Sequence, residues 1–409
     1  MTSARTHRKQ ENIQPGAKKK SHEADFLIVV LTAVLTFFGL TMVYSASLYK
    51  SLSKYGHTYH FLKDDFIWMA LGWIILIVAA GFPYKRLRMF CYPALAVGEV
   101  LLLLIFTPLG IEINNARRWL YFGITVMPGE IIKTCLILFM ARYYSDDPNR
   151  IKGPLVFRRK AGRLKAVMNW ETSRSFLFMM AVMGINFLLI FKQPNLSTAG
   201  IVVLLMACIM YVAGLSYLLV TLGITAAGGL VFITAKNIIP LISGYMMKRL
   251  DNFWNPWADA LGKGFQVCQG LLALGSGGVF GMGLGQSVQK TLYLPEPQND
   301  FILAIIGEEL GFAGILALLI VYVLLIWRCF KVAISANDYF GMLLASGVGI
   351  HLALQVLLNI AVVTASFPPT GVVLPFVSLG GNATLLFFGE IGIVLNISKT
   401  TKQLKESEE

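Results

Sequence analysis

Charged residues are scarce in this sequence. Asp, Glu, Lys and Arg make up 14% of its 409 residues, whereas hydrophobic residues make up 56%. A soluble protein carries about a quarter charged residues, so the composition excludes an ordinary soluble domain. The apolar residues are arranged in runs of about 20, the length at which a helix crosses a hydrocarbon layer roughly 30 Å thick. The sequence therefore predicts an all-α polytopic membrane protein.

Cysteine is also sparse, and its pattern excludes two kinds of site. An odd number of cysteines without paired spacing argues against a disulfide framework and against a zinc site. Free cysteines usually behave as small buried hydrophobes. No group of His, Cys and carboxylate residues has the spacing of metal ligands, so we expect no metal site made by the protein alone. The five cysteines are Cys91, Cys135, Cys208, Cys268 and Cys329.

Three further signals are missing. No short apolar core is followed by a small-residue cleavage site, so the first apolar run, which starts at Phe26, is predicted to be retained as a span. The glycine-dense run at 274–286 is not a phosphate loop, because no strand precedes it and no Gly-Lys-Ser/Thr ends it. No convincing internal repeat is present, which disfavours a transporter built from repeated halves.

About ten apolar runs are predicted to be transmembrane helices. An even number places both termini on one side. Most Lys and Arg residues flank the spans on that side, which makes both termini cytoplasmic. The net charge of +13 is therefore attributed to contact with membrane headgroups rather than with nucleic acid. The predicted spans are 26–47, 64–82, 91–108, 128–144, 176–191, 197–214, 216–235, 301–327, 340–362 and 382–397.

The domain organisation follows from these spans. A basic cytoplasmic tail, 1–25, precedes a single membrane domain, 26–397, and a second cytoplasmic tail, 398–409, follows it. A large outer loop, 236–300, joins the seventh span to the eighth. Within it, residues 238–257 are predicted to form a helix at the membrane interface, because their apolar side chains and two tryptophans suit the headgroup level.

The most informative stretch is 295–312, which reads PEPQNDFILAIIGEELGF. It places Glu296 and Asp300 in a proline-containing loop, and Glu308 and Glu309 in the apolar run that follows. Carboxylates at the mouth of a membrane and inside it are costly, and by default they mark a functional site. Asp300 is the candidate general base, because a carboxylate partly withdrawn from water is a better base near neutral pH.

Each of these carboxylates also has a plainer interpretation. Asn299 or Asp300 followed by an apolar run is an ordinary helix N-cap. Glu308 falls near Asp300 around the helix and is expected to line the same cavity, whereas Glu309 must find another partner. The plainer interpretation of both glutamates is a pair of structural carboxyls that hold helices together.

A second group of candidates lies at the outer end of the fourth span. Glu130 and Lys133 are three residues apart and can pair on one helix face. Arg117 and Arg118 lie on the outer side, against the inside bias of basic residues, and arginine is the preferred residue for phosphate. The plainer alternatives are a structural ion pair and an exposed, solvated pair of arginines.

Weaker candidates lie elsewhere in the chain. Arg249 is beside the predicted interfacial helix and can contact lipid headgroups. His351 and Gln355 share a face of the ninth span and are predicted to make hydrogen bonds between helices. Glu99, inside the third span, requires a partner that the sequence does not identify.

Several separate motifs, in the right order and over nearly the whole chain, resemble the SEDS family of bacterial cell-wall proteins, whose branches are FtsW, RodA and SpoVE. GLGQSVQK together with PPTG looks more like the FtsW division branch than the RodA branch. The matching stretches are NARRWLYFG…PGEIIK at 115–133, KQPNLSTAGIV at 192–202, RLDNFWNP at 249–256, GKGFQVCQGLLALGSGGVFGMGLGQSVQK at 262–290, LPEPQNDFILAIIGEELGFAG at 294–314 and PPTGVVLPFVSLGGN at 368–382.

The resemblance implies a peptidoglycan glycosyltransferase that polymerises lipid II and releases undecaprenyl diphosphate. In this family the aspartate of the PE…DF motif is catalytic, and here that residue is Asp300. Arg118, Lys133 or Arg249 would stabilise the leaving diphosphate, and Glu130 would hold Lys133 in place. The further substrate-binding candidates are Gln266, Gln269, Glu296, Glu308, Ser378, Gly380 and Gly381.

The sequence departs from the family pattern at several positions. Gln298 and Asn299 replace the usual His-Thr before the catalytic aspartate, which excludes a histidine base at 298. Asn195 replaces an aspartate, which puts any carboxylate role at that position in doubt. None of these changes removes Asp300.

The resemblance also implies partners and a location. The partners are lipid II, the growing glycan strand, a class B penicillin-binding transpeptidase, small bitopic division proteins and membrane lipids, with no nucleic acid. The location is the bacterial cell membrane, at the division septum. Magnesium or manganese would be held with the substrate diphosphate rather than by a dedicated site. The alternative functions are a lipid II flippase and a non-catalytic scaffold of the division machinery.

Overall fold

The computed structural model describes residues 24–408 except 114–115, 148–149, 151–154, 161–162, 169, 194, 216–224, 226–252, 254, 263 and 370. The predicted seventh span and interfacial helix lie almost wholly outside the described residues, and Arg249 lies outside them. The helices are α1 (Phe26–Tyr55), α2 (His60–Gly81), α3 (Tyr84–Leu104), α4 (Pro128–Asp146), α5 (Trp170–Phe191), α6 (Leu196–Val212), α9 (Phe265–Gly277), α10 (Ile302–Ile334), α11 (Tyr339–Val363), α12 (Asn382–Glu408) and the short 3₁₀ helix η2 (Pro256–Asp259).

Helices form the body of the molecule, so the all-α prediction is confirmed in class. Within the described residues, seven helices are long and apolar enough to cross a membrane. They match the first, second, third, fifth, eighth, ninth and tenth predicted spans. Helix α4 matches the fourth but carries several charged residues, and α6 matches the sixth but has only 17 residues. The total of ten spans stays a prediction.

Two small sheets interrupt the helical pattern, and the sequence did not predict them. One has the strand order β1 (Gly110–Ile113), β2 (Ala116–Tyr121), β3 (Thr125–Val126), all antiparallel. The other is the hairpin of β4 (Leu155–Lys160) and β5 (Arg163–Met168).

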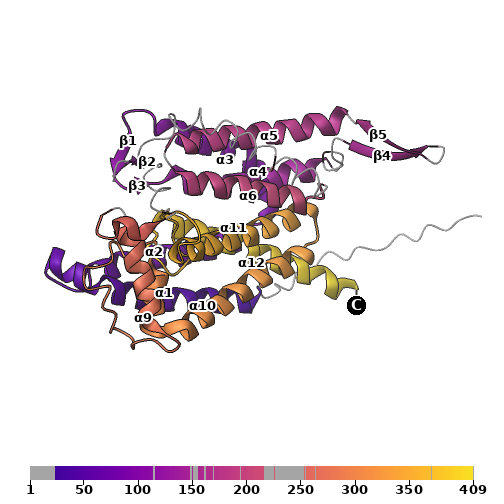
Figure 1. The fold of residues 1–409 in the computed structure, drawn as a ribbon. Helices are drawn as coiled ribbons and strands as arrows, with labels where there is room; N and C mark the ends of the chain where they lie inside the picture. The colour runs from indigo at the N-terminus through magenta and orange to yellow at the C-terminus, as the bar shows by residue number, and fades with distance from the viewer. Residues whose placement is uncertain are drawn as a thin grey trace, which may run out of the picture.

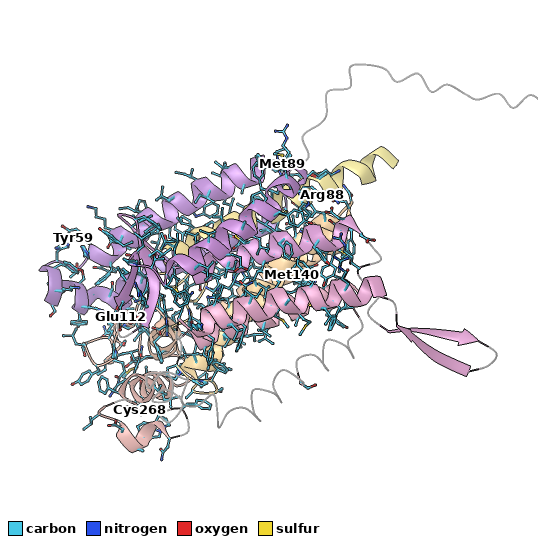
Figure 2. All side chains as sticks on the ribbon, turned by 90° about the horizontal axis from the view of Figure 1, so that it is seen from above. Tyr59, Arg88, Met89, Glu112, Met140 and Cys268 are labelled. Carbon is cyan, nitrogen blue, oxygen red and sulfur yellow. The ribbon has the colours of Figure 1, made fainter. Side chains whose placement is uncertain are left out.

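The two ends of the bundle differ in what they carry. Figure 1 shows α9 and the first sheet at one end, and the β4–β5 hairpin and the C-terminus at the other. The backbone N–H of Asp25 donates to Oγ of Ser398 at 3.1 Å, so the start of α1 and the late part of α12 lie at the same end. Figure 2 places Tyr59 and Glu112 at the opposite end from Arg88. The cytoplasmic assignment of the termini stays a prediction.

Small residues set how closely the helices of the core approach one another. A methyl group added at Gly72 of α2 would lie 2.1 Å from the Phe388 ring of α12, and one added at Gly392 would lie 2.6 Å from Cβ of Ala79. Helix α2 and helix α12 therefore run beside each other at a distance that larger side chains would not permit. This close pair holds the segment just before α12, which forms part of the site described below.

Helix α10 is discontinuous at Gly311, whose φ of 68° and ψ of −169° are not helical. The glycine-dense segment after α9 supplies the missing hydrogen bonds. The N–H groups of Met282 and Gly283 donate to the carbonyls of Glu308 and Glu309 at 2.9 and 3.0 Å, and Phe312 N–H donates to the carbonyl of residue 278 at 2.9 Å. Irregular backbone at this depth is tolerated because its polar groups are satisfied within the protein.

Replacing Gly311 by alanine is expected to destabilise the protein severely. The added methyl would lie 2.3 Å from the backbone nitrogen of Gly281, in a backbone conformation that alanine avoids. We expect a loss of more than about 3 kcal/mol, seen as a lower melting temperature in detergent. Gly275→Ala is the matched control in α9. No atom lies within 4 Å of the added methyl there, so a gain of up to about 1 kcal/mol is expected. Equal melting temperatures for the two variants would contradict this account.

Candidate active site

A cavity of about 620 Å³ lies at the end of the bundle that carries the first sheet and α9. Its wall combines residues of α2, β2, β3, α4, α9 and the start of α12 with the two segments that precede α10 and α12. The charged residues in the lining are Arg118, Glu130, Glu296 and Asp300. The remaining lining residues are Trp68, Ala116, Trp119, Ile124, Thr125, Met127, Gln266, Pro295, Asn299, Gly371, Val373, Leu379, Gly380, Gly381, Asn382 and Ala383.

Asp300 lines this cavity, as the sequence predicted, and it is partly buried. Helix α10 begins at Ile302 with Phe301 at its N-cap position and no side-chain cap hydrogen bond. Asp300 therefore lies before the cap position, which disfavours the plainer interpretation of this residue. Its backbone carbonyl accepts a hydrogen bond from Nδ2 of Asn359 at 2.9 Å, which ties residue 300 to helix α11.

The segment before α12 lies directly against the candidate base. A methyl group added at Gly371 would be 3.8 Å from Oδ2 of Asp300, and the φ of Gly371 is +73°. The same Nδ2 of Asn359 also donates to the carbonyl of Val372 at 2.7 Å. The backbone N–H of Leu379 donates to the carbonyl of Gln298 at 3.0 Å. These bonds fix two loops far apart in sequence into one wall.

Glu296 is held by its own loop and by α1. Its Oε2 accepts hydrogen bonds from Gln298 Nε2 at 3.0 Å and from Asn299 Nδ2 at 3.2 Å. Its Oε1 pairs with Nζ of Lys50 near the outer end of α1. Glu296 itself adopts a φ of +48°, which an L-residue rarely takes. The surrounding contacts must stabilise this backbone, and such strained residues cluster at functional sites.

The alternation of strand β2 separates the two adjacent arginines. Ala116, Arg118 and Leu120 face the buried side. Arg118 lines the cavity, and its Nε donates to the carbonyl of Gln193 at 3.3 Å. Arg117 instead donates from Nε to the carbonyl of Gly110 at 3.1 Å. Of these two arginines, Arg118 alone lines the cavity, so the solvated-pair alternative does not hold for it.

Glu130 and Lys133 form the predicted ion pair. Nζ of Lys133 lies 2.7 Å from Oε2 of Glu130, and it donates to Oε1 of Gln355 at 3.2 Å. Lys133 is fully buried, whereas Glu130 is part of the cavity lining. The lysine therefore lies behind the wall and acts on the cavity through Glu130. Nε2 of Gln355 donates to the carbonyl of Val373 in the opposite wall at 3.2 Å.

Glu308 does not line the cavity, contrary to the prediction. Its carboxylate accepts hydrogen bonds from Oγ of Ser287 and from the backbone N–H of Val288 at 2.9 Å. Glu309 accepts from Ser45 at 2.7 Å and pairs with Lys290 at 2.6 Å. Both carboxylates are buried and anchor segment 287–290 to the first half of α10. The hydrogen bonds agree with the interpretation as structural carboxyls for both residues, but Glu309 alone joins two helices, through Ser45 of α1, whereas Glu308 joins α10 to a loop.

The other predicted substrate-binding residues divide into two groups. Gln266, Gly380 and Gly381 line the cavity. Gln269, on the same helix as Gln266, is partly buried and does not line it. Ser378 is buried, and its Oγ accepts a hydrogen bond from Leu374 N–H at 2.9 Å within its own loop. Ser378 therefore shapes the wall and is not exposed to the cavity, which corrects its predicted position.

Several residues that line the cavity or pair with its lining were not identified from the sequence. Lys50 lies at the outer end of the first span, whereas most Lys and Arg residues flank the spans on the cytoplasmic side. This exception to the positive-inside rule could have identified it. Gly371 and Asn382 lie within or at the end of the PPTGVVLPFVSLGGN motif. Trp68 carried no signal, because an aromatic residue inside a span is ordinary. Its ring lies against Gly381, whose φ is +48°.

Asn195 is used as a helix cap. Its Oδ1 accepts a hydrogen bond from Thr198 N–H at 3.3 Å at the start of α6. An asparagine serves this purpose as well as an aspartate does. Asn195 does not line the cavity, in agreement with the doubt raised about a carboxylate role there.

Within the described part of the chain, no three His, Cys, Asp or Glu side chains come together as a possible metal-ligand set. The expectation that a metal ion would be held with the substrate diphosphate therefore stays a prediction. The lining carboxylates Glu130 and Glu296 each pair with a lysine, which makes them poor candidates for a dedicated cation site.

Comparison with known proteins identifies the family. The model of the FtsW/RodA/SpoVE family, described as "Cell cycle protein", matches residues 25–403. The chain belongs to this family. Among curated members, stage V sporulation protein E of Bacillus subtilis is 35% identical over 94% of this chain and 99% of its own length. A probable peptidoglycan glycosyltransferase FtsW of Trichlorobacter lovleyi is 35% identical over 93% of this chain and 94% of its own.

Solved structures share the family fold. A chain from a study of the coordination of polymerization and crosslinking by a peptidoglycan synthase complex matches with a TM-score of 0.70, at 24% identity, over 92% of this chain and 98% of that chain. The rod shape determining protein RodA of Thermus thermophilus matches with a TM-score of 0.62, at 25% identity, over 92% of this chain and 96% of that chain. The overall fold is therefore shared with these solved structures, and the protein is a multi-pass membrane protein.

Proposed function

We propose that this protein polymerises lipid II into glycan strands and releases undecaprenyl diphosphate. The observation that carries the proposal is the position of Asp300. This carboxylate lines a cavity that also holds Arg118 and the wall residue Glu130. Curated relatives over most of the chain are named probable peptidoglycan glycosyltransferases, which supports the same chemistry.

The reaction is a glycosyl transfer with inversion. Asp300 accepts the proton of the acceptor sugar's 4-hydroxyl while that oxygen attacks the anomeric carbon of the donor chain. The bond from the anomeric carbon to the diphosphate oxygen breaks on the opposite face, and undecaprenyl diphosphate leaves with the electron pair. General base catalysis of this kind contributes about 10²–10⁴-fold to a rate.

The leaving diphosphate gains charge as the bond breaks, and fixed cations stabilise it. Among the described residues, Arg118 is the cation of the cavity lining, and a guanidinium suits the geometry of phosphate oxygens. Lys133 adds positive charge behind Glu130 and keeps that carboxylate oriented. A magnesium or manganese ion arriving with the substrate would add to this charge.

The biological setting follows from the same relationship. We infer that the protein acts at the division septum with a class B penicillin-binding transpeptidase and small bitopic division proteins. An apolar face of α10, which includes Phe312, Ile320 and Val323, is exposed in the bundle. A single transmembrane helix of a partner or the lipid itself would cover that face.

Proteoliposomes that contain the protein, its cognate transpeptidase and lipid II test the proposed function. The enzyme produces glycan polymer on gels, and polymer formation depends on Asp300. The alternative function, a flippase, shares the cavity and the substrate. Translocation of the lipid II headgroup without polymer would therefore support the flippase and reject the polymerase. Absence of both activities would favour a scaffold.

A further inference from the structure

Deeper in the bundle than the cavity wall, three side chains from three helices meet. Oγ1 of Thr134 on α4 donates to Oε1 of Glu390 on α12 at 2.6 Å. Nδ1 of His351 on α11 lies 3.0 Å from Oε2 of the same glutamate. His351 and Glu390 are each 1% exposed. These three residues are called the triad below. The reaction described above uses none of them.

The triad lies directly beneath the wall that carries Glu130. Thr134 follows Lys133 along α4, and His351 is one turn, about 6 Å, from Gln355 along α11. Helices α4 and α11 are therefore joined at two successive levels. The upper level is the bond from Lys133 to Gln355 at 3.2 Å, and the lower level is the triad.

The triad also joins α12 to these helices. The first residues of α12, Asn382 and Ala383, line the cavity, and Glu390 is two turns further along the same helix. Within the described residues, Nε2 of His351 has no hydrogen-bond partner. The imidazole is therefore oriented by Glu390 and by the Phe387 ring, whose centroid is 5.0 Å away. Loss of Glu390 would release both Thr134 and His351.

Stability alone is a weak reason for such a cluster. A buried ionic or strongly polar pair can often be replaced by apolar residues of similar volume without loss of stability. Ionisable residues inside a membrane are costly and by default functional. The triad fixes how α4 is placed. Its bonds set the rotation of α4 about its own axis and its position along that axis relative to α11 and α12.

We propose that Thr134, His351 and Glu390 are positioning residues that set the placement of the Glu130–Lys133 pair at the cavity wall. The inference rests on the proposed glycosyl transfer for its catalytic consequence. None of the three lines the cavity. Their effect is on the geometry of the wall, and a misplacement of about 1 Å can cost about a hundredfold in rate.

The central experiment replaces the ionisable pair by leucine, as His351→Leu with Glu390→Leu in the full chain with its cognate transpeptidase. We expect the double variant to melt at or above the wild-type temperature. We expect kcat for lipid II polymerisation to fall about a hundredfold, with KM unchanged, because substrate contacts remain. The amides of residues 132–136 should exchange hydrogen for deuterium faster than in the wild type, because α4 loses its lower anchor.

Conservative variants separate positioning from charge. Glu390→Gln can accept from Thr134 and donate to His351, so it should keep near-wild-type kcat. Thr134→Val should lower kcat, as the double variant does, and Thr134→Ser should restore it.

The matched control is Glu99→Leu with Asn186→Leu. That pair also joins two helices, through a bond of 2.7 Å between α3 and α5, and its loss should leave kcat and the exchange of α4 unchanged.

Each outcome decides the proposal. A folded His351→Leu, Glu390→Leu variant with wild-type kcat and wild-type exchange of α4 would overturn it. A Glu390→Gln variant as inactive as the double variant would also overturn it, because charge rather than position would then be the requirement. If the wild type makes no polymer, the proposed function fails separately. In that case faster exchange of α4 supports the positioning role, and unchanged exchange rejects it.

Discussion

Asp300→Asn is expected to abolish polymerisation of lipid II, with a fall in kcat of at least about 10²-fold. Asparagine keeps the size of the side chain but cannot accept the acceptor sugar's proton. The backbone bond from Asn359 to the carbonyl of residue 300 is unaffected, so folding should be preserved. The measurement is glycan product from purified protein with its cognate transpeptidase, together with binding of labelled lipid II, which should be retained.

Glu296→Gln is the matched control for this prediction. It removes a carboxylate from the same loop and the same cavity, but it keeps an amide oxygen that can accept from Gln298 and Asn299. The lost pair with Lys50 is partly exposed, and such pairs contribute about 0.2–1 kcal/mol. We expect an activity loss below about fivefold. A complete loss in Glu296→Gln, with activity retained in Asp300→Asn, would transfer the base role to Glu296.

Lys133→Leu is expected to destabilise the protein by about 3–5 kcal/mol, because it leaves Glu130 beside apolar surroundings without its cation. The double variant Glu130→Leu with Lys133→Leu should recover most of this stability, since no uncompensated charge remains. Polymerisation should be lost in both variants, because the positive charge that Lys133 places behind Glu130 at the cavity wall is gone. Melting temperature in detergent and polymer yield separate the two effects.

Lys50→Leu is the control for the lysine substitution. It also breaks a lysine–glutamate pair of the cavity, but that pair is partly exposed, so a loss below about 1 kcal/mol is expected. If Glu130→Leu with Lys133→Leu is as unstable as Lys133→Leu alone, Lys133 stabilises the fold through Gln355 rather than by pairing with Glu130.

Much of the site could be predicted from local pattern. The spacing of Glu130 and Lys133 predicted their pairing, and the position of Asp300 just before an apolar run predicted a carboxylate at the mouth of the bundle. His351 and Gln355 were predicted to make bonds between helices, and both do. These predictions held because helix periodicity fixes which neighbours share a face.

Other features depended on contacts between segments far apart in the chain. The helical angle alone predicted that Glu308 lies near Asp300 at the cavity. In the structure its carboxylate instead accepts hydrogen bonds from the loop at 287–289. The partner of Glu99 is Asn186, which is 87 residues away. Arg117 and Arg118 are equivalent in sequence. The alternation of side chains along β2 places Arg118 at the cavity and Arg117 on the other face of the strand.

The amino-acid sequence by itself determined that this protein lies in a lipid bilayer and that it is built of helices. Long apolar runs can be stable only as helices in lipid, because every backbone polar group must be satisfied inside the segment. The tertiary structure decided which charges face the cavity. A break at Gly311 needs a distant loop to satisfy its carbonyls, and a carboxylate buried in the bundle is stable only beside a partner that another helix supplies. Such partners are set by packing in three dimensions, and no local pattern encodes them.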